Sequence, residues 1–91
     1  MISNKEKKYI KSLQIKKYRQ QHQAFLVEGW KSVEELLDSN YEVELLFVSE
    51  KYENLCNGVV LNAKEINEIS SLANNQDAIA VVKMPNSNIK V

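Results

Sequence analysis

Residues that could bind an anion gather near the N-terminus of this chain. The candidate site consists of Lys11, Lys16, Lys17, Tyr18, Arg19 and His22. Lysine and arginine side chains neutralise phosphates, and aromatic rings placed among them can stack on unpaired bases. The combination predicts an RNA-binding segment in which His22 is an auxiliary contact. The alternative interpretation is an ordinary solvated helix face, because charge alone does not require a ligand.

Residues that could perform catalysis are scarce. No G-x-S-x-G, G-x-x-x-x-G-K or G-x-G-x-x-G motif occurs, and two isolated glycines cannot build a phosphate or cofactor loop. His22 is the only histidine and has no partner residue for acid–base work. Cys56 is the only cysteine, which excludes an internal disulfide and a zinc site of soft ligands. We expect Cys56 to be a small buried thiol, and the segment to be non-catalytic with no cofactor or metal of its own.

The charge of the chain is divided unevenly although it sums to zero. Residues 1–22 carry seven basic side chains and one acidic side chain, whereas the remainder carries five lysines and eleven acids. Such a division suggests a basic arm that meets an anion. No apolar run reaches the ~18 residues that cross a bilayer, and the N-terminus lacks the apolar core of a secretion signal. We therefore expect a cytoplasmic protein with no membrane partner.

The elements that position the basic residues can be predicted from capping and periodicity. Ser3 and Glu6 have the spacing of a capping box, which predicts that a helix begins there, and Asn62 with Glu65 predicts a second capped helix start. Residues 16–23 show no apolar periodicity and predict a loop or a frayed helix end. Residues 24–27 are apolar and predict a strand. The basic segment 1–22 is thus expected to be a helix followed by a loop.

Glu28 and Gly29 follow that strand and are expected to shape a tight turn into the next helix. Glycine suits such a turn because it adopts unusual backbone angles at little cost. Trp30 opens a helix with helical apolar spacing, so we expect its ring in the core rather than free to stack on a base. For Tyr9, which lies among lysines, packing and base stacking both stay open.

The rest of the chain alternates strands and helices. The pattern predicts a strand at 43–48, at most a helical turn at 52–55, a strand at 59–61, a helix at 62–73, a strand at 78–82 and a linker at 85–91. Strands that are apolar along their whole length belong in a sheet covered on both faces. The predicted fold is an α/β domain over residues 1–84, a three-layer α/β/α sandwich with a small mixed, mostly parallel four-stranded sheet. Its predicted core comprises Phe25, Val27, Val33, Leu37, Leu46, Val48, Val60, Ile66, Ile69, Ile79 and Val81.

The order and spacing of several motifs resemble one known family. Lys-Lys-Tyr-Arg at 16–19 precedes Phe-Leu-Val-Glu-Gly at 25–29 and an amphipathic helix with Glu-Leu-Leu at 35–37. This arrangement resembles the opening of the substrate-binding domain of SpoU (TrmH-like) RNA 2'-O-ribose methyltransferases, and the likeness extends over residues 8–84. The family has Pro-Gln-Gly before its closing strand, whereas this chain has Asn75-Gln76-Asp77. The missing glycine implies a different turn there.

The resemblance implies more than the residues show by themselves. It implies the fold of the kink-turn-binding ribosomal proteins, capture of structured RNA (rRNA or tRNA), and a catalytic knotted domain beyond Val91. That domain would bind S-adenosylmethionine, transfer its methyl group to a ribose 2'-oxygen, and usually forms a homodimer.

Two alternatives stay open at this point. One is a free-standing kink-turn binder without catalysis, a class that carries Gly-x-Asn-Glu where this chain has Gly-Trp-Lys-Ser at 29–32. The other is a protein-interaction module that uses the acidic helix around Glu34, Glu35 and Asp38.

Overall fold

The chain folds into one sheet with short helices on both of its faces. The structure is a computed structural model that describes residues 2–71 and 74–84. Its elements are α1 (Asn4–Ser12), α2 (Lys16–His22), β1 (Ala24–Glu28), α3 (Trp30–Leu37), β2 (Val43–Val48), the 3₁₀ helix η1 (Glu50–Leu55), β3 (Val59–Val60), α4 (Ala63–Ile69) and β4 (Ala78–Lys83). The expected linker at 85–91 lies outside the described residues. No helix in the described part of the chain is long and apolar enough to span a bilayer.

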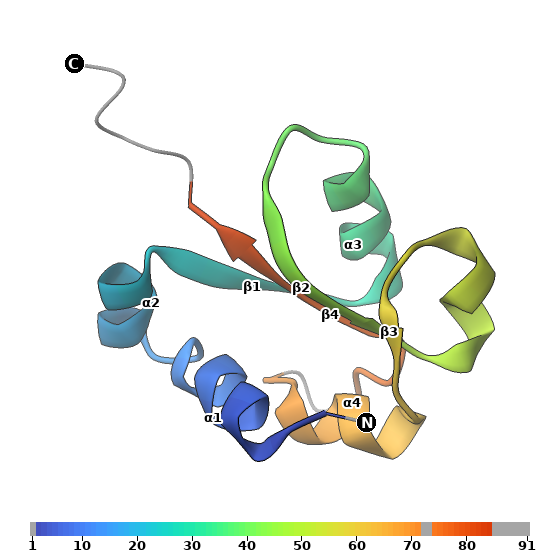
Figure 1. Ribbon diagram of the computed structural model, residues 1–91, viewed down its shortest axis with the longest axis horizontal. Helices are drawn as coiled ribbons and strands as arrows, with labels where there is room; N and C mark the ends of the chain where they lie inside the picture. The colour runs from blue at the N-terminus through green and yellow to red at the C-terminus, as the bar shows by residue number, and fades with distance from the viewer. Residues whose placement is uncertain (1, 72–73, 85–91) are drawn as a thin grey trace.

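The sheet has four strands in the order β1-β4-β2-β3. Figure 1 shows α1 and α4 on one face of the sheet and α3 on the other, which confirms the three-layer α/β/α arrangement. The sheet is mixed, as predicted, but it is not mostly parallel. Only β2 and β3 are parallel neighbours, and β4 pairs antiparallel with both β1 and β2.

The reversed direction of β4 reflects the end of the sheet at which that strand begins. β1, β2 and β3 all run the same way, as alternation with helices predicts. Ala78 at the start of β4 pairs with Val48 at the end of β2, and the Ser49 N–H donates a hydrogen bond of 2.8 Å to the Asp77 carbonyl. The chain therefore does not return to the far end of the sheet before β4 begins. The predicted helix at 62–73 ends at Ile69, where Ser70 takes an extended conformation.

Both predicted helix starts at capping boxes are confirmed. The Ser3 hydroxyl accepts a hydrogen bond from the Glu6 N–H at 3.1 Å, and the Glu6 carboxylate accepts from the Ser3 N–H at 3.2 Å. Asn62 and Glu65 repeat this reciprocal pair at the start of α4. Each box satisfies backbone donors that a helix leaves free at its first turn.

The core has two halves divided by the sheet. Residues 78–82 of β4 are all buried, and its alternate side chains enter the two halves: Ile79 and Val81 face α1 and α4, whereas Ala78 and Ala80 face α3. Of the predicted core, six side chains are buried, namely Val33, Val48, Ile66, Ile69, Ile79 and Val81. Three more, Phe25, Val27 and Leu46, are partly buried and pack against the α3 half.

Two predicted core residues are exposed instead. Leu37 is 40% exposed and Val60 is 39% exposed. Val33 and Leu36 form the buried face of α3. Leu37 is the next residue along the helix and lies outside this face. Val60 belongs to a two-residue strand at the edge of the sheet, where it has a neighbouring strand on only one side.

Candidate nucleic-acid interface

The basic segment forms a second helix rather than the loop that the sequence predicted. α2 spans Lys16–His22 and buries none of its residues, which explains why no apolar periodicity revealed it. It begins at Ile15 without a side-chain cap and ends at Gln23, which has a left-handed φ of 53°. The Gln23 carbonyl accepts a hydrogen bond of 2.8 Å from the Met84 N–H. The end of α2 is therefore fixed to the end of β4.

Three of the predicted phosphate ligands are exposed lysines. Lys11 lies in the last turn of α1, and Lys16 and Lys17 lie in the first turn of α2. Lys17 Nζ is 5.7 Å from the ring centroid of Tyr18, which is half-buried. By contrast, Lys7 Nζ lies 3.6 Å from Glu68 Oε1. We refer to these three exposed cations on consecutive helices, Lys11, Lys16 and Lys17, as the lysine surface.

Arg19 has a different environment from the three lysines. It is half-buried, and its Nη1 donates a hydrogen bond of 3.0 Å to the Leu13 carbonyl. This bond ties α2 back to the end of α1. Arg19 also lines a pocket of about 290 Å³ together with Glu28 and Ser71. The structure thus brings Arg19 near Glu28, at the other end of β1, and gives it a structural contact that the sequence did not reveal.

His22 lies against Tyr9, a residue that the sequence left between packing and stacking. The two ring centroids are 5.1 Å apart and the planes are nearly perpendicular at 87°. The Tyr9 hydroxyl donates a hydrogen bond of 2.7 Å to Glu44 Oε1 on β2. Burial, together with the hydrogen bond to Glu44 and the negative charge of Glu44, raises the pKa of Tyr9 to about 12. Tyr9 therefore packs between the helices and the sheet.

Glu28 and Gly29 form the junction between β1 and α3. The Glu28 carboxylate accepts hydrogen bonds from the Ser71 N–H at 3.0 Å and from the Ser71 hydroxyl at 2.7 Å. Gly29 has a φ of 90°, a conformation that L side chains rarely adopt, and no atom lies within 4 Å of the place a Cβ would occupy. The backbone angle, and not lack of space, is what requires glycine here.

The turn before β4 is organised by Asn75, whose role sequence reasoning missed. Its side chain is 7% exposed, donates to the Ser70 hydroxyl and the Ala78 carbonyl at 2.8 Å each, and accepts from the Asp77 N–H at 3.2 Å. In the described chain only Gln23 and Gly29 have a positive φ, so Asp77 needs no glycine. The sequence did contain a signal for this role. Asn75 lies two residues before Asp77 in the turn that enters β4, and Asn side chains in turns often bond the backbone two residues further on.

An aromatic pair at the opposite side of the domain was also missed. The rings of Trp30 and Tyr52 stack with centroids 4.4 Å apart and planes 10° apart, and Lys51 Nζ lies 5.4 Å from the Tyr52 centroid. Trp30 is partly buried against the α3 half of the core, in keeping with the expected packing role. The adjoining surface carries the carboxylates of Glu34, Glu35 and Asp38 and does not favour a phosphate.

The matching family model and the similar structures agree on one class of protein. The model of the MRM3-like substrate binding domain matches residues 4–83. A protein from Porphyromonas gingivalis assigned to the TrmH family of RNA methyltransferases is 30% identical, with a TM-score of 0.79 over 94% of this chain and 37% of its own. An AdoMet-bound rRNA methyltransferase from Sinorhizobium meliloti is 26% identical, with a TM-score of 0.69 over 93% of this chain and 35% of its own.

This chain therefore belongs to the MRM3-like substrate binding domain family, the substrate-binding part of TrmH/SpoU RNA methyltransferases. A further structure, an RNA 2'-O ribose methyltransferase, is 22% identical with a TM-score of 0.74 over 92% of this chain and 36% of its own, and shows the same fold. The chain spans about a third of the length of these proteins. No curated protein sequence matches it significantly.

The described residues do not fit the cofactor that one of these proteins binds. Gly29 shapes the start of α3, and a Cβ on Gly58 would lie 2.9 Å from Leu46 Cγ, so both glycines of the chain serve packing and turns. Neither glycine is therefore left to line a loop that lets a bound cofactor approach the backbone closely. The described residues also contain no group of three His, Cys, Asp or Glu side chains that could hold a metal ion.

Proposed function

We propose that this chain captures folded rRNA or tRNA for an RNA ribose 2'-O-methyltransferase and presents one ribose to a catalytic domain that follows Val91. That domain would bind S-adenosylmethionine and form the homodimer. The observation that carries the proposal is the lysine surface, three exposed cations on consecutive helices of a domain from a substrate-binding family. Cations of this kind neutralise phosphates and position an RNA backbone.

The relatives support the division of labour between two domains. The chain matches only 35–37% of proteins named as RNA methyltransferases, so most of each relative lies outside the matched part. A free-standing kink-turn binder is less well supported, because the matching family model describes a substrate-binding domain and the similar structures are named as RNA methyltransferases. A cytoplasmic location stays a prediction from the sequence.

The experiment is a pair of binding measurements on residues 1–91. Fluorescence anisotropy with labelled folded rRNA and tRNA fragments should show binding at low salt, and calorimetry with S-adenosylmethionine alone should show none. A single-stranded RNA of the same length and base composition is the matched control, and it should bind more weakly. Micromolar binding of S-adenosylmethionine to this chain, or no preference for folded RNA, would contradict the proposal.

A further inference from the structure

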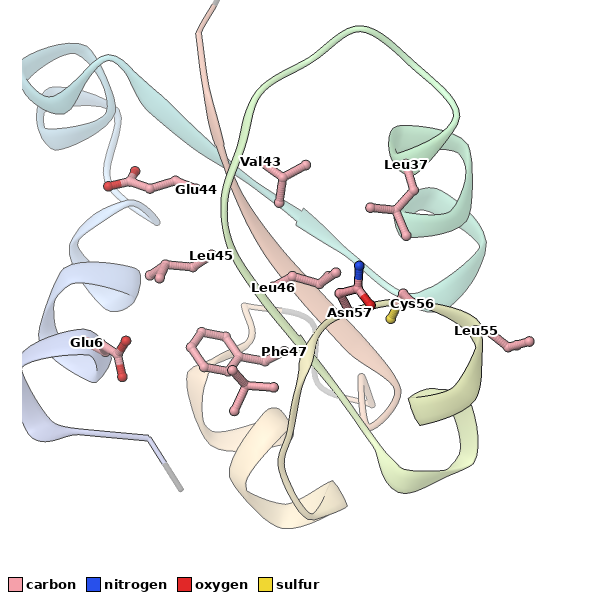
Figure 2. A pocket seen from close by; sticks show the side chains of 11 residues that line it. Glu6, Leu37, Val43, Glu44, Leu45, Leu46, Phe47, Leu55, Cys56 and Asn57 are labelled. Carbon is pink, nitrogen blue, oxygen red and sulfur yellow. The ribbon is translucent and has the colours of Figure 1, made fainter.

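The sheet leaves part of one strand edge open. β3 pairs with β2 only through Phe47 and Val48, so residues 43–46 of β2 have no outer neighbour strand in the part of the chain that the structure describes. A cleft of about 570 Å³ runs beside them, as Figure 2 shows. An open strand edge offers backbone N–H and C=O groups that another strand can pair with.

The two walls of this cleft differ in chemistry. On the side of α3 and η1 lie Leu37, which is 40% exposed, and Leu55, which is 64% exposed, with Cys56 between the strand and η1. On the side of α1 lie the carboxylates of Glu6 and Glu44. No lysine or arginine is among the described residues that line the cleft.

A neighbouring hollow is also lined by apolar side chains and carboxylates. It has a volume of about 560 Å³, shares Leu37 and Leu55 with the cleft, and is otherwise lined by Trp30 and the carboxylates of Glu34, Glu35 and Asp38. Exposed large apolar side chains that are contiguous and rimmed by polar groups mark interaction sites. The acidic rim makes a cation the complementary partner group.

The geometry of a strand decides what fits between the two walls. Successive side chains of a strand point to opposite faces, so an added strand directs every second residue toward Leu37 and Leu55 and the others toward Glu6 and Glu44. A partner segment that complements both walls therefore alternates apolar residues with basic residues. RNA phosphates would be repelled by the carboxylates, and a second copy paired edge to edge would bring like charges together.

We propose that the open edge of β2 docks an extended protein segment in which apolar residues alternate with lysine or arginine. The partner adds a short strand beside residues 43–45, its apolar side chains pack on Leu37 and Leu55, and its cations pair with Glu6 and Glu44. None of Lys11, Lys16 and Lys17 lines the cleft, so the inference does not depend on the proposed RNA contact.

The test uses the whole chain and a synthetic heptapeptide, acetyl-Lys-Val-Lys-Val-Lys-Val-Lys-amide. Calorimetry should detect binding of this peptide, and amide resonances of Val43, Glu44 and Leu45 should shift on titration. A peptide with Glu in place of each Lys should not bind, and N-methylation of its alternate backbone amides should abolish binding of the basic peptide. Equal binding of the acidic and basic peptides would overturn the proposal.

Variants locate the binding on the chain. Leu37→Ser with Leu55→Ser should weaken peptide binding at least tenfold, whereas Ile15→Ser, at a residue that is 52% exposed outside the cleft, should not change it. Glu44→Gln keeps an acceptor for the Tyr9 hydroxyl and should weaken binding several-fold by removing one charge. Two results would refute the proposal by assigning the edge to a different occupant. One is loss of RNA binding in the double variant. The other is a wild-type chain that is dimeric in solution while the double variant is monomeric.

Discussion

At the scale of single residues, the buried side chain of Asn75 links three parts of the chain. It bonds Ser70 after α4, the backbone of its own turn, and the first carbonyl of β4. Asn75→Ala removes three side-chain hydrogen bonds, and each typically contributes about 0.5–1.5 kcal/mol, while the Ala78 carbonyl keeps the Gly29 N–H at 2.9 Å. We expect the free energy of unfolding to fall by about 2–4 kcal/mol in total.

Chemical denaturation measures this effect against a matched control in the same turn. Gln76 is exposed and adjacent, so Gln76→Ala should change the free energy of unfolding by about 0.5 kcal/mol or less. Equal losses in the two variants would mean that the turn, and not the Asn75 side chain, carries the stability.

Tyr9 makes a second residue-scale prediction, on pH. Burial and Glu44 raise the pKa of Tyr9 from 10.0 to about 12 in the folded chain. Because the folded state disfavours the ionised phenol, the stabilising effect of neutral Tyr9 is complete below pH 10 and is lost as the pH rises toward 12. The free energy of unfolding of the wild type should therefore fall across this window relative to that of Tyr9→Phe.

Denaturation at pH 8.5 and pH 11, about one unit or more either side of the usual tyrosine pKa, gives the comparison. Glu44→Gln serves as the control, since it keeps a hydrogen-bond acceptor but removes the charge, and it should reduce the pH dependence. A difference between wild type and Tyr9→Phe that is the same at both pH values would contradict the assignment.

At the scale of elements, α2 is the helix with the weakest local support. It has seven residues, no side-chain cap at its start and a non-glycine residue with positive φ at its end. A left-handed conformation costs an L residue roughly 1–2 kcal/mol that glycine avoids. Gln23→Gly should therefore stabilise the chain by up to about 1 kcal/mol after loss of the side-chain bond to the Gln20 carbonyl.

The matched control is glycine two residues earlier, inside the helix. Gln21→Gly should destabilise the chain by about 0.5–1 kcal/mol, because glycine in a helix interior loses more conformational entropy. Thermal unfolding of both variants separates the two effects. Destabilisation of similar size in both would show that position 23 gains nothing from glycine.

What the sequence could predict depended on whether a signal was local. Both capping boxes, the four strands and most of the core were predictable, because capping and apolar runs are encoded by neighbouring residues. α2 was not, since none of its residues is buried and it therefore has no apolar stripe. The direction of β4 was not either, because it depends on long-range contacts that place the start of β4 beside the end of β2.

The sequence predicted which residues belong to the candidate site, but not which of them make contacts within the domain. Sequence grouped Arg19 with Lys16 and Lys17, whereas the structure turns Arg19 inward to the Leu13 carbonyl. The sequence predicted His22 as an auxiliary RNA contact because its neighbours are basic. It did not predict the contact of His22 with Tyr9, because that contact depends on how α2 packs against α1. Long-range contacts of this kind leave no local pattern.

At the scale of the whole molecule, the two proposals rest on different residues of opposite charge. The lysine surface belongs to α1 and α2, and the acid-rimmed cleft is lined by Glu6 of α1, by β2 and by residues of α3 and η1. No residue belongs to both sets, so RNA binding and peptide binding can be tested with separate variants. The two proposals consequently fail or succeed independently.

The most direct test of RNA capture is the salt dependence of binding to a folded RNA. Each phosphate contact releases condensed counterions and contributes roughly 0.7–0.9 to the slope of log affinity against log salt. Replacing Lys11, Lys16 and Lys17 with Ala should therefore flatten the slope by about two to three units. Arg19 stays unchanged, because its hydrogen bond to Leu13 would confuse loss of charge with loss of structure.

The control removes the same charge from three other exposed lysines, Lys31, Lys51 and Lys64. We expect this control to keep nearly the wild-type slope, and both triple variants to keep the wild-type free energy of unfolding within about 1 kcal/mol. Equal slopes in the two triple variants would contradict the account, since the loss of net charge alone would then explain the change.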